Sequence, residues 1–208
     1  MASDLLPAAI AVFARPPVAG QVKTRLAATV GDQRALETYQ RLLQLTVARV
    51  SEAGCPWMLF SAGASTPLAA LAVQAAGSFH LQEGEQLGER MIRALLVAHR
   101  VARRVILIGC DCPALTGAHL QQALAALEEH EVVVGPAEDG GFWLLGSSAA
   151  ARWQDTGLLS GVPYGGADAL SRTCERLQQQ GSISTMLPLL WDLDTEADYW
   201  RAVRENLL

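Results

Sequence analysis

Lysine, long apolar segments and paired cysteines are all scarce in this sequence. Of its 16 basic residues, Lys23 is the single lysine and the others are arginines, a bias that we attribute to genomic base composition. No segment reaches the roughly 18 consecutive apolar residues of a membrane helix. The N-terminal residues also lack the cationic start and small-residue cleavage site of a secretory signal. We therefore expect a cytoplasmic protein that does not associate with membranes.

The cysteines and histidines are not spaced for a metal site. Cys110 and Cys112 form a C-x-C pair with no second pair and no histidine partner nearby, whereas zinc sites use C-x2-4-C. We interpret both as small, half-buried residues at a strand end, with reduced thiols. The four histidines share no common spacing and are expected at the surface or at an interface: His80, His99, His119 and His130.

The chain is acidic overall and rich in apolar residues. It has 208 residues, a net charge of -5 and 50% hydrophobic residues. Such a chain has no general attraction for nucleic acid, so nucleic acid is not expected as a partner and an anionic ligand needs a local basic site. The length and composition predict one globular domain, residues 1–208.

Apolar runs alternate with helical patterns along the chain. Strands are expected at residues 8–14, 57–61, 79–81, 104–108, 131–134, 141–146 and 183–187. Helices are expected from the N-cap Asp32 to Gly54, and at 67–76, 87–102, 118–128, 167–180 and 195–206. This order predicts a mostly parallel sheet with helices on both faces. Ligands of such sheets bind at the carboxyl ends of the strands, which directs attention to the loops there.

The loop after the first strand is basic. Arg15, Lys23 and Arg25 lie within eleven residues of a buried strand, and Gly20 permits close backbone approach and a positive φ. Backbone amides and three cations suit a triphosphate. The Walker pattern G-x-x-x-x-G-K-[ST] is absent, and a solvated basic loop is the alternative.

Asp111 directly follows the apolar strand 104–108 and the residues Gly109 and Cys110. A carboxylate there is poorly hydrated without a partner. Magnesium is a suitable partner because it prefers oxygen ligands and shares them with phosphates. The alternative is that Asp111 caps the next turn.

Two further acidic segments follow predicted strands. Asp139 precedes Gly140 and Gly141, which suit either a tight turn against a ligand or a plain hairpin. Asp194 lies just before a helix start, where ordinary N-capping is the alternative role. Because side chains alternate along an extended segment, Asp192 and Asp194 share a face and could both point at a metal.

Several ordered motifs together resemble a known family. They are F-A-R-P-P-x-x-G-x-V-K-T-R-L at 13–26, Q-L-G-E-R-M at 86–91, G-C-D-C-P at 109–113, G-P-A-E-D-G-G at 135–141 and D-L-D-T-x-x-D at 192–198. Across nearly the whole chain they resemble the DUF2064, or selenodomain-associated transferase 1, family. That family is similar to phospholactate and molybdenum-cofactor guanylyltransferases. The implied fold is α/β: a Rossmann-like three-layer sandwich with a mostly parallel mixed sheet, of the nucleotide-diphospho-sugar transferase (GT-A) type.

The resemblance implies a role for each loop. It implies a divalent metal, Mg2+ or Mn2+, on Asp111 and Asp194, with Asp192 a weaker ligand candidate. Lys23, Asp111 and Asp139 are the implied catalytic residues, and Gly140 and Gly141 line the acceptor side. The implied nucleotide-binding residues are Ala14, Arg15, Pro16, Gly20, Lys23, Thr24 and Arg25.

The sequence also departs from the related enzymes. The guanine-recognising turn L-A-G-G-x-S-x-R-M-G is replaced by R-P-P-V-A-G, and Pro113 removes the second acid of a D-x-D motif. The first hypothesis is nucleotidyl transfer from a nucleoside triphosphate to an anionic small-molecule acceptor. Glycosyl transfer from a sugar nucleotide, with Asp139 as base, is the second, and a non-catalytic nucleotide-binding module is the third. Whether the protein forms a homodimer stays open.

Overall fold

A computed structural model describes residues 5–154, 158–181 and 184–208. Within these ranges one seven-stranded sheet has the order β3-β2-β1-β4-β6-β5-β7. The strands are β1 (Leu6–Ala14), β2 (Trp57–Ser61), β3 (Ser78–Leu81), β4 (Ala102–Ile108), β5 (Val132–Pro136), β6 (Phe142–Ser147) and β7 (Ser184–Met186). The helices are α1 (Thr24–Val30), α2 (Asp32–Ser51), α3 (Thr66–Gln74), α4 (Leu87–Ala98), α5 (Gly117–Ala126), the 3-10 helix η1 (Ala150–Trp153), α6 (Ala169–Gln179) and α7 (Glu196–Arg204).

The sheet is parallel except at β6, which runs antiparallel to both β4 and β5. Val12 of β1 lies opposite Leu59 of β2 on one side and Ile108 of β4 on the other. From β1 the chain therefore adds β2 and β3 toward one edge, then returns to place β4 on the other side of β1. This reversal of strand order is the position where open α/β sheets bind ligands, beyond the carboxyl ends of the strands.

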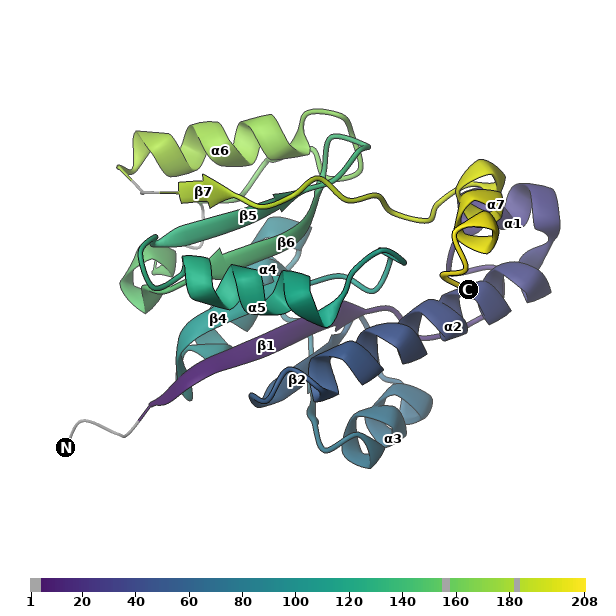
Figure 1. Ribbon diagram of the computed structural model, residues 1–208, viewed down its shortest axis with the longest axis horizontal. Coiled ribbons are helices and arrows are strands. Elements are labelled where there is room, and N and C mark those ends of the chain that lie inside the picture. The colour runs from purple at the N-terminus through teal and green to yellow at the C-terminus, as the bar shows by residue number, and fades with distance from the viewer. Residues whose placement is uncertain (1–4, 155–157, 182–183) are drawn as a thin grey trace.

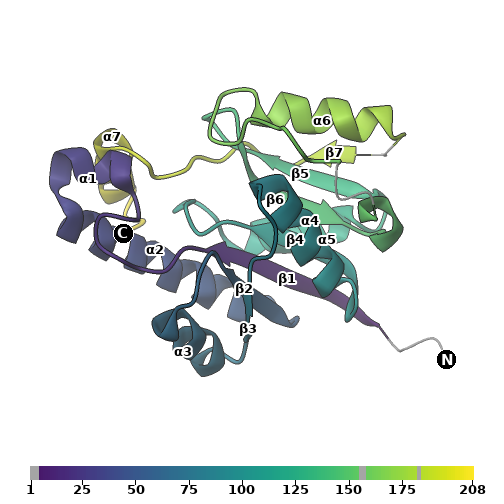
Figure 2. The same cartoon turned by 180° about the vertical axis from the view of Figure 1, so that it is seen from behind.

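Helices cover both faces of the sheet, as Figures 1 and 2 show. Alternate residues of β1 point to opposite faces, as strand geometry requires. Ile10 and Val12 pack in a core with α2, α3 and α5, and Ala9 and Ala11 pack in a second core with α4 and Trp153. The expected three-layer α/β sandwich with a mostly parallel mixed sheet is confirmed.

A third apolar cluster joins α1 and α2 to the C-terminal segment. Leu26 of α1 and Leu42 of α2 pack against Trp191, Leu193 and Ala202 of the C-terminal segment. In Figure 1 this group, with α1 and α7, lies beyond the end of the sheet where β1 terminates. The packing brings the segment after β1 next to the segment before α7.

Most predicted elements are present, and the differences have physical reasons. The predicted helix 87–102 ends at Ala98, because the chain turns at residues 99–101 and Ala102 begins β4. Gly31 with φ 83°, not Asp32, occupies the N-cap of α2. Helix α1 was not predicted, because its seven residues are too short to show a clear apolar period. Of the strand expected at 183–187, Ile183 lies outside the described residues.

Two predictions about side-chain burial were wrong. Cys110 and Cys112 are buried, not half-buried, and burial raises the pKa of each thiol to about 12, so both stay protonated. His99 is also buried: its ring contacts the Ser147 hydroxyl at 3.0 Å, and burial lowers its pKa. None of the described helices is both long enough and apolar enough to cross a membrane.

Candidate active site

The reversal of strand order places two sequence-predicted residues side by side. Lys23 lies at the end of the loop that follows β1, and Asp111 lies in the loop that follows β4. Because β1 and β4 are adjacent and parallel, both loops leave the sheet at the same edge. The Lys23 ammonium contacts the Asp111 carboxylate in an ion pair.

Asp194 is brought to the same place by the C-terminal segment. The Leu193 N–H donates a hydrogen bond to the Asp111 carbonyl at 2.9 Å, so residues 192–194 run directly beside the β4 loop. The Thr195 side chain accepts from the Asp198 N–H while the Asp198 carboxylate accepts from the Thr195 N–H, a reciprocal capping box. Thr195 is therefore the N-cap of α7, which leaves the Asp194 carboxylate free of that role.

Lys23 joins the two aspartates. Its ammonium lies 3.1 Å from Asp194 Oδ1 as well as in contact with Asp111, and its side chain is only 3% exposed. Burial by itself lowers the pKa of the ammonium, but the charges of Asp111 and Asp194 outweigh burial and hold the pKa above its usual range. The backbone at Lys23 is left-handed (φ 48°, ψ 44°), an uncommon conformation for a residue with a side chain. Strain of this kind concentrates at functional sites.

The other residues predicted to bind nucleotide lie around Lys23 and the two aspartates, and of these Arg25 contacts Asp194. The Arg25 guanidinium lies 3.3 Å from Asp194 Oδ2 and is 67% exposed. Arg15 and Thr24 are exposed, and Arg15 makes no ion pair with any described residue. Gly20 has the expected positive φ of 75°. Ala14 is the buried last residue of β1, and Pro16 follows it at the sheet edge.

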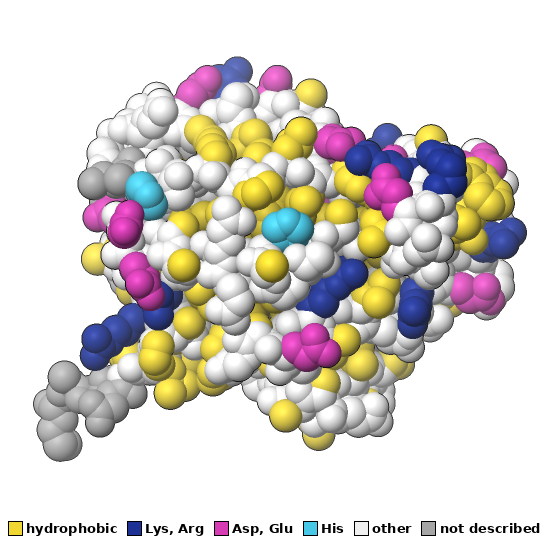
Figure 3. Space-filling model, viewed as in Figure 1, with side chains coloured by type: hydrophobic (Ala, Val, Ile, Leu, Met, Phe, Trp, Pro, Cys, Tyr) yellow, Lys and Arg dark blue, Asp and Glu magenta, His cyan; other side chains and the backbone are white. Residues whose placement is uncertain are grey.

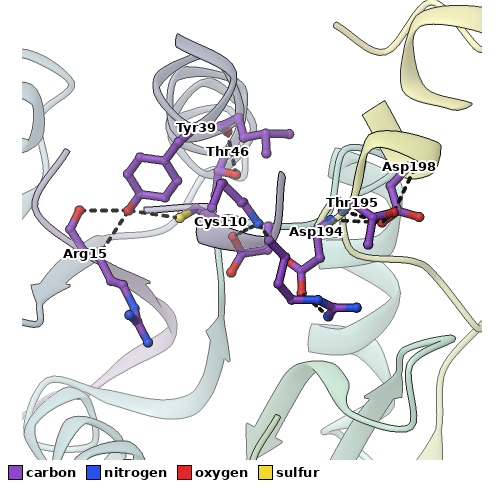
Figure 4. A network of polar contacts seen from close by, with 11 residues as sticks. Arg15, Tyr39, Thr46, Cys110, Asp194, Thr195 and Asp198 are labelled. Atoms are coloured by element: carbon purple, nitrogen blue, oxygen red, sulfur yellow. Dashed lines mark hydrogen bonds and ion pairs between the residues drawn. The ribbon is translucent and has the colours of Figure 1, made fainter. Parts of the chain in front are cut away.

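Tyr39 fixes the start of the basic loop, as Figure 4 shows. Its hydroxyl accepts from the Arg15 N–H and donates to the Arg15 carbonyl, both at 2.8 Å. The Cys110 thiol lies 3.6 Å from the same oxygen. One buried hydroxyl thus ties the loop after β1 to the residue before Asp111. Tyr39 lies within the helix that the sequence predicts from Asp32 to Gly54, but no local sequence pattern indicates these long-range contacts.

More acidic than basic groups are buried or half-buried at this edge. Burial first, then the charges of Asp111, Asp139 and Asp194, raise the pKa of Asp192 to about 7, and the Lys23 charge opposes this shift. Such a surplus of carboxylates fits a hard divalent cation. No three His, Cys, Asp or Glu side chains of the described ranges are grouped closely enough to hold a metal by themselves. Asp111 and Asp194 would therefore need ligand oxygens to complete a coordination shell.

The segment 135–141 forms the turn between β5 and β6. The Asp139 carboxylate is exposed and accepts a hydrogen bond from the Gly141 N–H at 2.8 Å, the geometry of a hairpin turn. A Cβ on Gly140, whose φ is 86°, would lie 2.2 Å from the Ala167 carbonyl oxygen. Glu138 binds Arg201 of α7 through two contacts of 2.8 and 3.2 Å, so the turn also anchors the C-terminal helix.

Figure 3 shows acidic and basic side chains interspersed over the end of the molecule that carries α1 and α7.

Comparison with known proteins identifies the family. A family model described as "Uncharacterized protein conserved in bacteria (DUF2064)" matches residues 44–166, more than half of the chain. The chain belongs to the DUF2064 family. The matched part contains Asp111 and Asp139, whereas Lys23 and Asp194 lie outside it. No curated protein matches the chain in sequence.

Solved structures share the DUF2064 fold seen in this chain. A Desulfovibrio desulfuricans G20 protein, provisionally assigned to the nucleotide-diphospho-sugar transferases, is 28% identical over 97% of this chain and 88% of its own, with a TM-score of 0.87. CMP:2-keto-3-deoxy-manno-octonic acid synthetase, in complex with CTP, is 16% identical over 97% of this chain and 100% of its own, with a TM-score of 0.56. Mycobacterium tuberculosis glucosyl-3-phosphoglycerate synthase, in complex with Mn2+, UDP and glucosyl-3-phosphoglycerate, is 11% identical over 97% of this chain and 77% of its own, with a TM-score of 0.55. The chain has the fold of nucleotide-diphospho-sugar transferases.

Proposed function

We propose that this protein is a metal-dependent nucleotidyltransferase that uses a nucleoside triphosphate and an anionic small-molecule acceptor, within one domain spanning residues 1–208. The observation that carries the proposal is the convergence of Lys23, Asp111 and Asp194 at the strand-order reversal. These residues come from three distant segments, and they place a buried cation and two carboxylates where α/β sheets bind ligands. The fold is shared with a synthetase whose structure contains CTP.

The basic loop provides the groups that this reaction needs for a triphosphate. Lys23 would bind phosphate oxygens through its ammonium. Arg15 on the loop and Arg25 in the first turn of α1 are exposed, with no carboxylate partner other than Asp194 among the described residues. Cations so placed neutralise charge that grows on departing pyrophosphate. Gly20, with its positive φ, lets the backbone of the loop approach the phosphates.

Asp111 and Asp194 are the residues that would hold Mg2+ or Mn2+, with Asp192 beside them. Such an ion supplies charge neutralisation at the reacting phosphate when bound. Their carboxylates are 46% and 37% exposed, so both can be reached from solvent. Using one or two carboxylates plus substrate phosphates is the usual way in which proteins bind Mg2+.

An anionic acceptor requires no strong base, since its attacking oxygen is already charged. Asp139 then acts at the acceptor side by position: its carboxylate holds the Gly140–Gly141 turn through the Gly141 N–H. A second candidate is glycosyl transfer from a sugar nucleotide. It is favoured by the exposure of Asp139, whose charge also reaches Asp192, because an acceptor hydroxyl would need a carboxylate base there.

Product analysis tests the proposal. The protein is incubated with Mg2+, each nucleoside triphosphate and a panel of phosphorylated and carboxylic acceptors, and pyrophosphate is measured. In parallel, sugar nucleotides with the same acceptors are assayed for nucleoside diphosphate. Magnesium-dependent pyrophosphate release supports nucleotidyl transfer, and nucleoside diphosphate release alone replaces it with glycosyl transfer. Nucleotide binding with neither product, retained after Asp111→Asn, would instead favour a non-catalytic module.

A further inference from the structure

The Lys23 side chain occupies the position between the two carboxylates that would hold a metal. Its ammonium contacts Asp111 Oδ1 and lies 3.1 Å from Asp194 Oδ1. One positive charge therefore already neutralises part of the negative charge of both carboxylates. The lysine is 3% exposed, whereas the carboxylates are 46% and 37% exposed. The ammonium therefore lies beneath the carboxylates, which keep a face toward solvent.

The proposed function needs each of these groups for a different partner. Lys23 is needed for phosphate oxygens, and Asp111 and Asp194 are needed for a divalent cation. A dication held by the same carboxylate oxygens would lie close to the ammonium, and in a partly buried site two like charges at that distance repel strongly. The contacts of Lys23 and the contacts of the metal are thus mutually opposed.

We propose that Lys23 is a built-in counter-cation, which holds Asp111 and Asp194 until nucleotide phosphates take its ammonium and the divalent metal replaces it. This inference rests on the proposed function and adds to it a coupling between metal and nucleotide. Metal alone binds weakly because it must displace the lysine. Metal with nucleotide binds well because the displaced ammonium gains phosphate partners.

The local structure allows this exchange without rebuilding the loop. Lys23 is the N-cap residue of α1, and its left-handed backbone is held by the Ala27 N–H, which donates to the Lys23 carbonyl at 2.8 Å. A lysine side chain has four methylene groups, so its ammonium can move while this backbone stays in place. By linkage, the factor by which nucleotide tightens metal binding equals the factor by which metal tightens nucleotide binding.

The first test measures Mn2+ binding to the full chain, by titration with electron paramagnetic resonance, without nucleotide. Lys23→Met removes the charge while keeping a flexible side chain of similar length. We expect the variant to bind Mn2+ at least tenfold more tightly than wild type without nucleotide. Arg41→Met, which removes one charge from the exposed face of α2, is the matched control and should stay within twofold of wild type. Equal or weaker Mn2+ binding by Lys23→Met would overturn the inference.

A second test needs no variant and so does not depend on whether Lys23→Met folds. Lys23 is the single lysine, so acetylation at its side chain is followed by mass spectrometry, with the chain's α-amino group as internal control. We expect slow labelling without ligand, at least threefold faster labelling at a Mn2+ concentration that occupies the site, and renewed protection when a non-hydrolysable triphosphate is added. An unchanged labelling rate at saturating Mn2+ would show that the metal leaves Lys23 in place.

The two tests separate the inference from the proposed function. If wild type binds Mn2+ and nucleotide together but Lys23→Met gains no Mn2+ affinity, the lysine does not compete and only the inference fails. If Mn2+ binds neither protein, with or without nucleotide, the metal-dependent function fails as well. Tighter Mn2+ binding by Lys23→Met together with weaker nucleotide binding supports both.

Discussion

Tyr39 is the residue whose loss most directly tests the rigidity of the basic loop. Tyr39→Phe removes both hydrogen bonds to the Arg15 backbone and leaves a partly buried N–H and carbonyl without that partner. The net contribution of one hydrogen bond to folding stability is roughly 0.5–1.5 kcal/mol. For the loss of two, we expect a decrease of about 1–3 kcal/mol in the free energy of unfolding, together with weaker nucleotide binding. Thermal unfolding and nucleotide titration measure the two effects.

Tyr199→Phe is the matched control for that substitution. Tyr199 is half-buried on α7, and its ring, rather than its hydroxyl, carries its contact with the Arg34 guanidinium. We expect both its melting temperature and its nucleotide affinity to match wild type. A Tyr39→Phe protein that melts at a lower temperature but binds nucleotide normally would show that Tyr39 stabilises the fold without positioning the loop.

Asp192 gives the metal-free protein a pH dependence of defined sign. Burial and neighbouring carboxylates raise the pKa of Asp192 to about 7, so between about pH 4 and 7 the folded state holds a proton that the unfolded state has lost. Its contribution to stability therefore decreases as the pH rises through this window. Asp192→Asn should melt close to the wild-type temperature at pH 4, and its gain in melting temperature over wild type should grow as the pH rises to 8. Equal melting temperatures at both values would contradict the shifted pKa.

Among the helices, α4 depends on a residue without a side chain. A Cβ on Gly88 would lie 2.2 Å from the Leu159 carbonyl oxygen, and Gln86 accepts a hydrogen bond from the Gly161 N–H at 3.1 Å. The motif at 86–91 therefore has a structural role, since Gly88 and Gln86 pack α4 against residues 159–161. We expect Gly88→Ala to lower the free energy of unfolding by about 1–3 kcal/mol, as overpacking does, measured by urea unfolding.

Gly117→Ala is the corresponding control at the start of α5. No atom lies within 4 Å of a Cβ built there, and its φ is not positive. We expect a neutral effect or about 0.4–1 kcal/mol of added stability, because alanine restricts the unfolded chain. An equal loss in both glycine variants would attribute the effect to helix position and not to the contact with Leu159.

The elements with clear periodicity could be predicted from the sequence, and those set by long-range packing could not. The strand 57–61 was predicted with its observed bounds, because five buried residues are flanked by turn signals. Helix α1 was missed because it is stabilised by Leu26 packing against Trp191 and Leu193, which lie more than 160 positions away. The end of α4 was placed too late because Ala102 continues the apolar spacing of the helix, although this residue begins β4.

For the molecule as a whole, the sequence indicated which loops meet but not how their side chains pair. The motifs at 13–26, 109–113 and 192–198 lie at one edge of the sheet, as predicted from the carboxyl ends of the strands. The contact of Lys23 with both aspartates was not predicted, because the sequence separates them by 88 and 171 positions and the lysine was assigned to phosphate alone. The roles of all these residues stay predictions.

The central claim is that metal and nucleotide share one site built on Asp111. The most direct test is calorimetric titration of nucleoside triphosphates into wild type, Asp111→Asn and the exposed control Asp168→Asn, each with and without Mg2+. Our account predicts magnesium-dependent binding to wild type and Asp168→Asn, and none to Asp111→Asn, whose melting temperature should stay within about 2–4 °C of wild type, or roughly 1 kcal/mol. Undiminished magnesium-dependent binding to a folded Asp111→Asn protein would contradict it.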